Sequence, residues 1–207
     1  MRRTTAVFLS LVTMLALAAS AFAMSALETL KERQRAIERA QDALTSSPDD
    51  STRKRSLDRA VRETFDFDRL ARQSIGSHWD EMTPDQQREY MWLFRSLVSK
   101  STVHVLEQYR ASKTEYGEVT GDSTDAVITT IVTSTSGDQV AIQYKLHRTN
   151  GRWWIWDRTI GLDTEITEFD VSSSENYRSA FNKLIGDEGI AGLLSKLRDK
   201  ERGGSDF

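Results

Sequence analysis

The 207-residue sequence contains no cysteine, which excludes disulfide bonds and thiolate chemistry whatever the redox state of its compartment. Its stability must therefore come from packing. Histidine is also scarce, because His78, His104 and His147 stand far apart and no paired spacing typical of zinc ligands occurs. The sequence therefore predicts no metal site and no cofactor.

Long apolar runs are absent after the N-terminus. Residues 1–23 contain two arginines, an apolar run that is short for a membrane span, and small residues ending in Ala21-Phe22-Ala23. This is the layout of a secretory signal peptide, and an uncleaved anchor is the alternative. We expect cleavage after Ala23, a soluble mature chain with a single domain over residues 24–202, and a disordered tail over residues 203–207.

Positive charge does not predominate. Loss of Arg2 and Arg3 with the signal peptide leaves 26 basic against 31 acidic side chains, which changes the formal net charge from −3 to −5. A nucleic-acid partner is therefore not expected. One basic cluster occurs within residues 53–62, and a solvated helix face is its first interpretation and a docking patch its second. Its members are Arg53, Lys54, Arg55, Arg59 and Arg62.

Both ends of the chain carry apolar residues at helical spacing. The most distinct helix start is Thr83-Pro84-Asp85-Gln86, which combines an N-cap threonine, proline at the first helical position and a glutamine three residues after the cap. We expect helices over Ser25 to Leu44, Asp50 to Phe65, Asp66 to Trp79, Pro84 to about Arg110, Ser174 to Ile185, and Ile190 to Lys200.

The middle of the chain changes to a period of two. Val140, Ile142, Tyr144 and Leu146 alternate with more polar residues, as in a half-buried strand, and Asn150-Gly151 is the favoured two-residue type I′ hairpin loop. These patterns predict an α+β fold, in which an antiparallel sheet of about four strands is wrapped by N-terminal and C-terminal helices. The expected strands are Thr114 to Thr120, Val127 to Thr133, Val140 to Leu146, and Arg152 to Ile160.

Several polar residues between Phe65 and Phe94 raise the question of a catalytic site. Ser74 and His78 are four residues apart on one expected helix, but no nucleophile-elbow glycines, preceding strand or oxyanion hole accompany them. Asp66 is better explained as a carboxylate at the positive end of a helix. We interpret Ser74, His78 and Asp80 as polar trim, by which we mean exposed polar side chains on the solvent face of a helix. We expect no catalytic residue.

The apolar residues of the same segment carry a pattern that resembles a known family. Phe65, Phe67, Leu70, Ala71, Gly76, Trp79, Thr83-Pro84, Gln87, Phe94 and Leu97 are similar to F-D-F-x-x-(M/L)-A…G-x-x-W…T-P-x-Q-Q…F…L of the MlaC-type phospholipid-binding proteins, or toluene-tolerance family. Tyr144-Lys145-Leu146, Asn150-Gly151-Arg152-Trp153, Asp157, Asn176-Tyr177-Arg178, Phe181, Gly189, Gly192 and Leu193-Leu194 resemble the later family motifs in the same order. One departure is that residues 161–170 extend the join before the C-terminal helix beyond its usual length.

The resemblance implies a periplasmic shuttle that carries phospholipid between an outer-membrane lipoprotein complex and an inner-membrane ABC transporter. It also implies an apolar cavity between helices and sheet, with Leu93, Phe94, Leu97 and Val98 of the long helix facing the apolar side of the sheet. The apolar stripes alone would instead indicate a filled core. The residues then expected to contact lipid are Leu70, Leu93, Phe94, Leu97, Val98 and Val105 from the first helices, Val140, Ile142, Tyr144, Leu146, Trp153 and Ile155 from the strands, and Tyr177 and Phe181 from the C-terminal helix.

Two other hypotheses stay open. Some relatives are associated with hopanoid synthesis, so the lipid could be a hopanoid or another polycyclic lipid. A small α+β cup could instead be an enzyme acting on an apolar substrate, with Asp157 or Asp163 as a base beside His147. Pairing of Asp157 with Arg178 is the structural alternative to that catalytic role, and it is the interpretation we prefer.

Overall fold

The structure is a computed structural model that describes residues 25–47, 50–108, 111–161 and 172–203, without the side chains of residues 104–108. The signal peptide expected over residues 1–23, the tail residues 204–207 and most of the extra segment 161–170 lie outside the described residues. After an N-terminal helix over residues 25–45 the order is α2 (Ser51–Thr64), α3 (Phe67–Ile75), α4 (His78–Glu81), α5 (Pro84–Gln108), β1 (Ala111–Gly121), β2 (Asp125–Ser134), β3 (Gln139–Thr149), β4 (Arg152–Gly161) and α6 (Ser173–Glu201).

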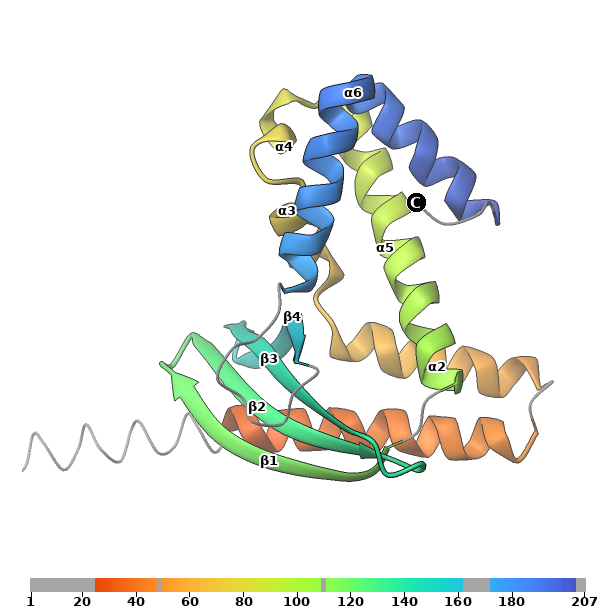
Figure 1. Ribbon diagram of the computed structural model, residues 1–207, viewed down its shortest axis with the longest axis vertical. Helices are drawn as coiled ribbons and strands as arrows, with labels where there is room; N and C mark the ends of the chain where they lie inside the picture. The colour runs from red at the N-terminus through yellow and green to blue at the C-terminus, as the bar shows by residue number, and fades with distance from the viewer. Residues whose placement is uncertain (1–24, 48–49, 109–110, 162–171, 204–207) are drawn as a thin grey trace, which may run out of the picture.

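The four strands form one curved antiparallel sheet in the order β1-β2-β3-β4 (Figure 1). Asn150 and Gly151 close the β3–β4 hairpin with φ angles of 53° and 77°, both positive as a type I′ turn requires. The register of this hairpin shifts once, because Leu146 pairs with Ile155 whereas Lys145 pairs with Asp157. Trp156 is therefore the extra residue of a β-bulge. The α+β class and all four expected strands are confirmed.

The N-terminal helix links the sheet to the rest of the molecule. Ala26 and Leu30 in its first half pack on the sheet, and Ile37 and Leu44 in its second half pack with residues of α2. Helix α2 runs back beside it (Figure 1). Asp50 caps α2, since its carboxylate accepts a hydrogen bond from the backbone N–H of Thr52 at 2.7 Å.

The expected single helix from Asp66 to Trp79 is wrong. Asp66 does cap a helix, accepting from the backbone N–H of Arg69 at 2.9 Å, but that helix, α3, ends at Gly76. Gly76 has φ 58°, in the left-handed region that costs glycine little, and the chain turns there before the short α4. Ser74 and His78 are consequently on different helices.

The long helices α5 and α6 begin with capping boxes. The expected one at Thr83 is confirmed, because the N–H of Thr83 donates to Oε1 of Gln86 at 2.9 Å and the N–H of Gln86 donates to Oγ1 of Thr83 at 3.3 Å. Ser172 and Glu175 form the second box, which we did not predict although the spacing Ser-x-x-Glu signals it. Gly189, with φ 70° and ψ 179°, divides α6 into the two expected helical halves.

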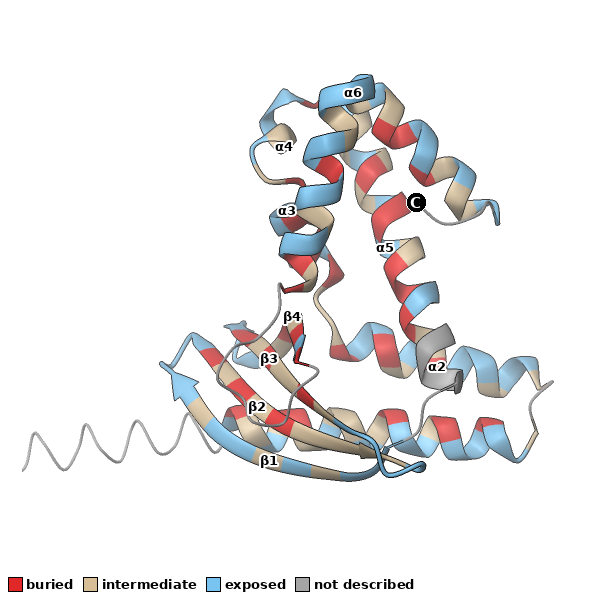
Figure 2. Ribbon diagram, viewed as in Figure 1, coloured by how far each residue is buried: buried red, intermediate tan, exposed pale blue. Residues whose placement is uncertain are grey.

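Buried apolar side chains form two separate clusters, and Figure 2 shows the helical part and the sheet part that contain them. No described helix is long and apolar enough to span a bilayer. The helical cluster comprises Ile37, Leu44, Leu57, Val61, Phe67, Leu70, Ala71, Ile75, Met82, Tyr90, Leu93, Phe94, Val98, Phe181, Leu193, Leu194 and Leu197. The sheet cluster comprises Ala26, Leu30, Ala126, Ile128, Tyr144, Leu146, Trp153 and Ile155.

Candidate functional site

A small cavity lies where β4 meets α3, α5 and α6, and we call it the junction cavity. Its volume is about 60 Å³. Leu70, Val98 and Tyr177, three of the expected lipid-contacting residues, contribute to its wall. The complete lining is Phe65, Phe67, Leu70, Val98, Ser101, Thr102, Trp156, Asp157, Arg158, Ser173 and Tyr177.

Phe65 joins the two clusters. Its partly buried ring packs against both of them, and it lies 5.8 Å from the ring of Phe67, measured between centroids. The backbone at this point also binds the sheet, because the N–H of Asp66 donates to the carbonyl of Ile155 at 2.7 Å. The α2–α3 corner is thus fixed to the start of β4.

His147 adds a polar link at the same corner. Its Nε2 lies 2.7 Å from Oδ2 of Asp66, and its Nδ1 lies 3.1 Å from Oγ1 of Thr149. The imidazole is buried and both of its nitrogens are engaged. His147 is therefore a connection between β3 and the N-terminus of α3, and it is not placed beside Asp157 as the enzyme hypothesis requires.

Asp157 holds the start of α6 against β4. One carboxylate oxygen accepts from the N–H of Ser174 at 3.1 Å, and the other accepts from the Ser174 hydroxyl at 2.7 Å and lies 3.5 Å from Nζ of Lys145. The preferred pairing of Asp157 with Arg178 is wrong, since the Arg178 guanidinium donates to the carbonyl of Gln73. The other base considered in the enzyme hypothesis, Asp163, lies outside the described residues.

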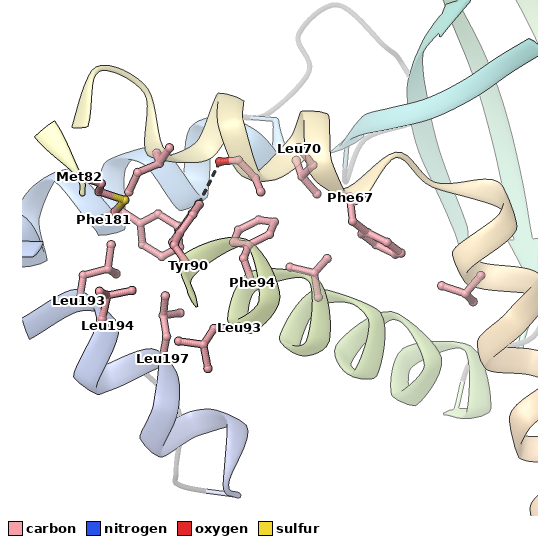
Figure 3. Packing of buried hydrophobic residues seen from close by; sticks show 14 of the residues in the cluster. Phe67, Leu70, Met82, Tyr90, Leu93, Phe94, Phe181, Leu193, Leu194 and Leu197 are labelled. Carbon is pink, nitrogen blue, oxygen red and sulfur yellow. Dashed lines mark hydrogen bonds between the residues drawn. The ribbon is translucent and has the colours of Figure 1, made fainter. Parts of the chain in front are cut away.

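The apolar side chains along one side of α5 are buried mainly among helices. Leu93 and Phe94 pack within the helical cluster, as Figure 3 shows, so our expectation that they face the sheet is wrong. The ring of Phe94 lies 5.1 Å from that of Tyr177 and 6.1 Å from that of Phe181, in edge-to-face arrangements that stabilise aromatic pairs. Leu97 packs partly buried against this cluster. The side chain of Val105 lies outside the described part of the chain.

Tyr90 fixes α5 to α3 in the same cluster. Its hydroxyl donates to the carbonyl of Ala71 at 2.9 Å, drawn as a dashed line in Figure 3. Burial raises the pKa of Tyr90 well above its ordinary value, so the phenol remains a hydrogen-bond donor at physiological pH. The helical cluster is therefore a packed core in its interior, and the cavity lies at its edge.

The expected sheet residues divide into two groups. Tyr144, Leu146, Trp153 and Ile155 are buried against the N-terminal helix. Further along the same sheet face the apolar side chains are less covered: Val140 and Ile142 are half-buried, and Ile160, which pairs with Ile142, is 41% exposed. This part of the face offers apolar surface that packing has not used.

The polar residues of the 65–94 segment are not all trim. His78 lies 3.0 Å from a carboxylate oxygen of Glu81 and Asp80 is exposed, as the trim interpretation predicts. Ser74, in contrast, is fully buried on α3, and its hydroxyl has no hydrogen-bond partner among the described residues. The trim interpretation is therefore wrong for Ser74.

Three of the five side chains in the basic cluster on α2, those of Arg53, Arg55 and Arg62, are already engaged in contacts within the chain. Arg53 donates to the carbonyl of Ala43 at 2.5 Å, and Arg62 forms an ion pair with Asp58 at 2.8 Å. Such contacts are what a solvated helix face shows, and docking through this cluster stays a prediction. Within the described ranges, no three histidine or acidic side chains converge as a metal site would need.

Phe65, Phe67 and Arg158 line the cavity but were not among the predicted site residues. The two phenylalanines stand in the family pattern, which signals their importance but not their position. Arg158 carries no such signal, because the bulge at Trp156 changes the face to which the following residues of β4 point.

Comparison with known proteins bears on this arrangement. The structure is similar to that of the phospholipid-binding protein from Ralstonia solanacearum, solved in complex with a phospholipid, with a TM-score of 0.70 and 22% sequence identity over 86% of this chain and 97% of that one. No curated protein matches the sequence. The sequence model described as MlaC protein matches residues 31–199, most of the chain. The chain therefore belongs to the MlaC protein family.

Proposed function

We propose that this protein is a periplasmic carrier that binds a phospholipid by its acyl chains between the helical cluster and the sheet cluster. The carrier passes lipid between an outer-membrane lipoprotein complex and an inner-membrane ABC transporter. Membership of the MlaC family supports this proposal. The observation that carries it is the phospholipid bound to the Ralstonia solanacearum protein, which has the same fold.

The energetics of acyl chains explain why a carrier is needed. Two typical chains contain on the order of 25 to 30 methylenes, and exposing them to water costs ~20 kcal/mol or more at ~0.8 kcal/mol each. Release into water is therefore extremely slow. Transfer must occur while the carrier is docked on a partner that continues the apolar path, and it requires no catalytic residue.

The junction cavity and the uncovered part of the sheet face are the surfaces we assign to the chains. Leu70 and Val98 supply apolar wall from the helices, and Val140, Ile142 and Ile160 supply it from the sheet. Chains lying between these surfaces would bury apolar area on both sides. The phosphate end would then lie near β4 and the start of α6, where the lining becomes polar.

Loading requires the two clusters to separate. A cavity of about 60 Å³ holds a few water molecules, and a cavity that binds benzene measures on the order of 150 Å³. An acyl chain has well over twice as many carbons as benzene, so the junction cavity corresponds to a closed form. Contacts between the sheet and the helices α3 and α6 are made mainly by β4, so we expect the sheet to swing about this strand on loading.

The test is native mass spectrometry of protein expressed in the periplasm and purified without detergent, followed by lipid extraction. We expect a bound two-chain phospholipid and a polypeptide that begins at Met24. A bound hopanoid would show that the carried lipid is a hopanoid and not a phospholipid. Protein that carries no lipid and takes none up from vesicles would contradict the carrier function.

A substitution in the junction cavity tests its position. Val98 is buried and lines the cavity, so Val98→Trp should fill the space and remove most bound lipid. Arg88→Trp is the matched control, because it places the same side chain on the exposed face of α5 and should keep lipid occupancy. Equal occupancy in the two variants would show that the chains lie elsewhere.

A further inference from the structure

The bulge in β4 directs one cationic side chain toward the proposed lipid site. Without the bulge, Arg158 would share a face with Trp154 and Trp156. Because Trp156 is the extra residue, Arg158 instead pairs with Tyr144 and lies on the same sheet face as the sheet cluster. Its side chain lines the junction cavity and is partly buried. Bulges recur where a strand must re-aim a side chain at a functional site.

Among the described residues, the guanidinium of Arg158 has no counter-charge. In the part of the chain that the structure describes, no carboxylate pairs with it and no acceptor receives a hydrogen bond from it; only its backbone N–H and carbonyl are engaged. The nearest acidic neighbour in sequence is Asp157, whose carboxylate accepts hydrogen bonds from Ser174 and forms an ion pair with Lys145. Partial burial of a charge without a partner costs free energy. The presence of arginine at this position therefore indicates a ligand that supplies the negative charge.

The surroundings of Arg158 fit an anionic group joined to apolar chains. Burial raises the pKa of the Tyr177 hydroxyl, and the positive charge of Arg158 acts against that rise. The same is true of Tyr144, where a hydrogen bond with Gln34 also contributes. Both phenols are therefore neutral donors close to the guanidinium. Beyond them the lining combines the apolar side chains of Phe65, Leu70 and Val98 with the polar residues Ser101 and Thr102.

We propose that Arg158 is the headgroup anchor of the site and binds the phosphate of a phospholipid whose acyl chains lie between the two clusters. The planar guanidinium matches two phosphate oxygens with parallel hydrogen bonds, which a lysine cannot do. This inference rests on the proposed function and adds to it a selectivity for lipids that carry phosphate. The carboxylate of a fatty acid and free phosphate offer related oxygens, and the experiment separates them.

The experiment measures binding of four probes to delipidated protein: dioleoyl phosphatidylglycerol, dioleoylglycerol with the same chains but no phosphate, oleate, and inorganic phosphate. For Arg158→Gln we expect phosphatidylglycerol to bind about ten- to a hundredfold more weakly, as the loss of a charge-assisted hydrogen-bonded pair implies. Dioleoylglycerol should bind within about threefold of its wild-type affinity, because its chains meet the same walls. Arg158→Lys should lie between the two.

Arg88→Gln is the matched control, since Arg88 lies on the exposed face of α5 and is paired with Asp85. It should leave the affinity for every probe unchanged. Wild-type protein should prefer phosphatidylglycerol to dioleoylglycerol and should not bind inorganic phosphate measurably, because the chains supply most of the affinity.

Each of the following results would overturn the proposal. Equal losses for phosphatidylglycerol and dioleoylglycerol in Arg158→Gln would mean that the arginine stem only packs. A wild-type preference for oleate, or no preference for phosphatidylglycerol over dioleoylglycerol, would exclude a phosphate anchor even if Arg158→Gln did not fold. Wild-type protein that binds no lipid would overturn the carrier function and this inference with it, whereas intact phospholipid binding in Arg158→Gln would overturn the inference alone.

Discussion

Ser74 and Asp157 are both buried polar side chains, but they differ in their hydrogen bonds. The carboxylate of Asp157 receives hydrogen bonds from the backbone and hydroxyl of Ser174, so its burial is compensated. The hydroxyl of Ser74 has no partner within the described structure. We therefore expect Ser74 to lower the stability of the protein, and Asp157 to raise it by holding α6 on β4.

The first prediction concerns Ser74. Ser74→Ala should increase the free energy of unfolding by about 1 kcal/mol, because it removes a buried hydroxyl without a partner and alanine is the better helix former. His78→Ala is the control, since it removes only a partly exposed ion pair and should change stability by less than about 0.5 kcal/mol. Urea denaturation of delipidated protein gives both values. A destabilised Ser74→Ala would indicate a hydrogen bond that the structure does not show.

Gly189 determines the course of α6 at the scale of the element. Its backbone, with φ 70° and ψ 179°, lies in a region that is essentially restricted to glycine. The kink turns the second half of the helix back along α5, as Figure 1 shows, and so brings Leu193, Leu194 and Leu197 into the helical cluster. A straight helix would extend away from this core.

The second prediction compares two glycines of α6. Gly189→Ala should destabilise the protein by about 1 to 3 kcal/mol, because alanine is strained at this φ and ψ. Gly186→Ala should be neutral or stabilise by up to about 1 kcal/mol, since Gly186 lies within the regular part of the helix. A Cβ at either position meets no atom within 4 Å, so crowding cannot explain a difference. Thermal unfolding of both variants is the measurement, and equal midpoints would contradict a rigid kink.

Local signals in the sequence predicted the elements better than their packing. The Thr83 capping box and the Asn150-Gly151 loop are determined by neighbouring residues, and both are confirmed. The bulge at Trp156 is not visible in a two-residue period, because an extra residue simply reverses the faces that follow. The orientation of Phe94 was also missed, since a stripe on a helix shows which side is buried but not what covers it. The sequence therefore did not reveal that Arg158 lies on the face of the sheet cluster, because the bulge determines this. It also did not reveal that Leu93 is buried among helices, because the covering elements determine this.

At the scale of the whole molecule, two apolar clusters meet at a narrow junction. The N-terminal helix contributes to both, Phe65 packs against both, and β4 provides most contacts between the sheet and the helices α3 and α6. We therefore expect each cluster to keep its own packing while the junction between them widens on loading. This arrangement suits a carrier, because loading then changes few of the contacts that stabilise either part.

The final prediction is that lipid widens this junction. The sequence has no cysteine, so two introduced cysteines give a uniquely labelled pair. Thr120 on β1 and Asn182 on α6 are both exposed. Labels at Thr120→Cys and Asn182→Cys therefore report on the positions of the sheet and of the helical part of the molecule. A layer of acyl chain between the clusters should lengthen the mean distance between spin labels by about 4 Å, the contact distance of one more layer of carbon atoms.

The matched control for this measurement lies within one part of the molecule. Arg88→Cys and Asn182→Cys are exposed positions on α5 and α6, whose packing in the helical cluster should not change on loading. Their label distance should be the same with and without phosphatidylglycerol. If the pair across the junction also keeps one distance in protein shown by mass spectrometry to hold lipid, the chains enter without separating the clusters. Loading would then need another route, and Val98 and Leu70 would no longer be assigned to the walls of the lipid site.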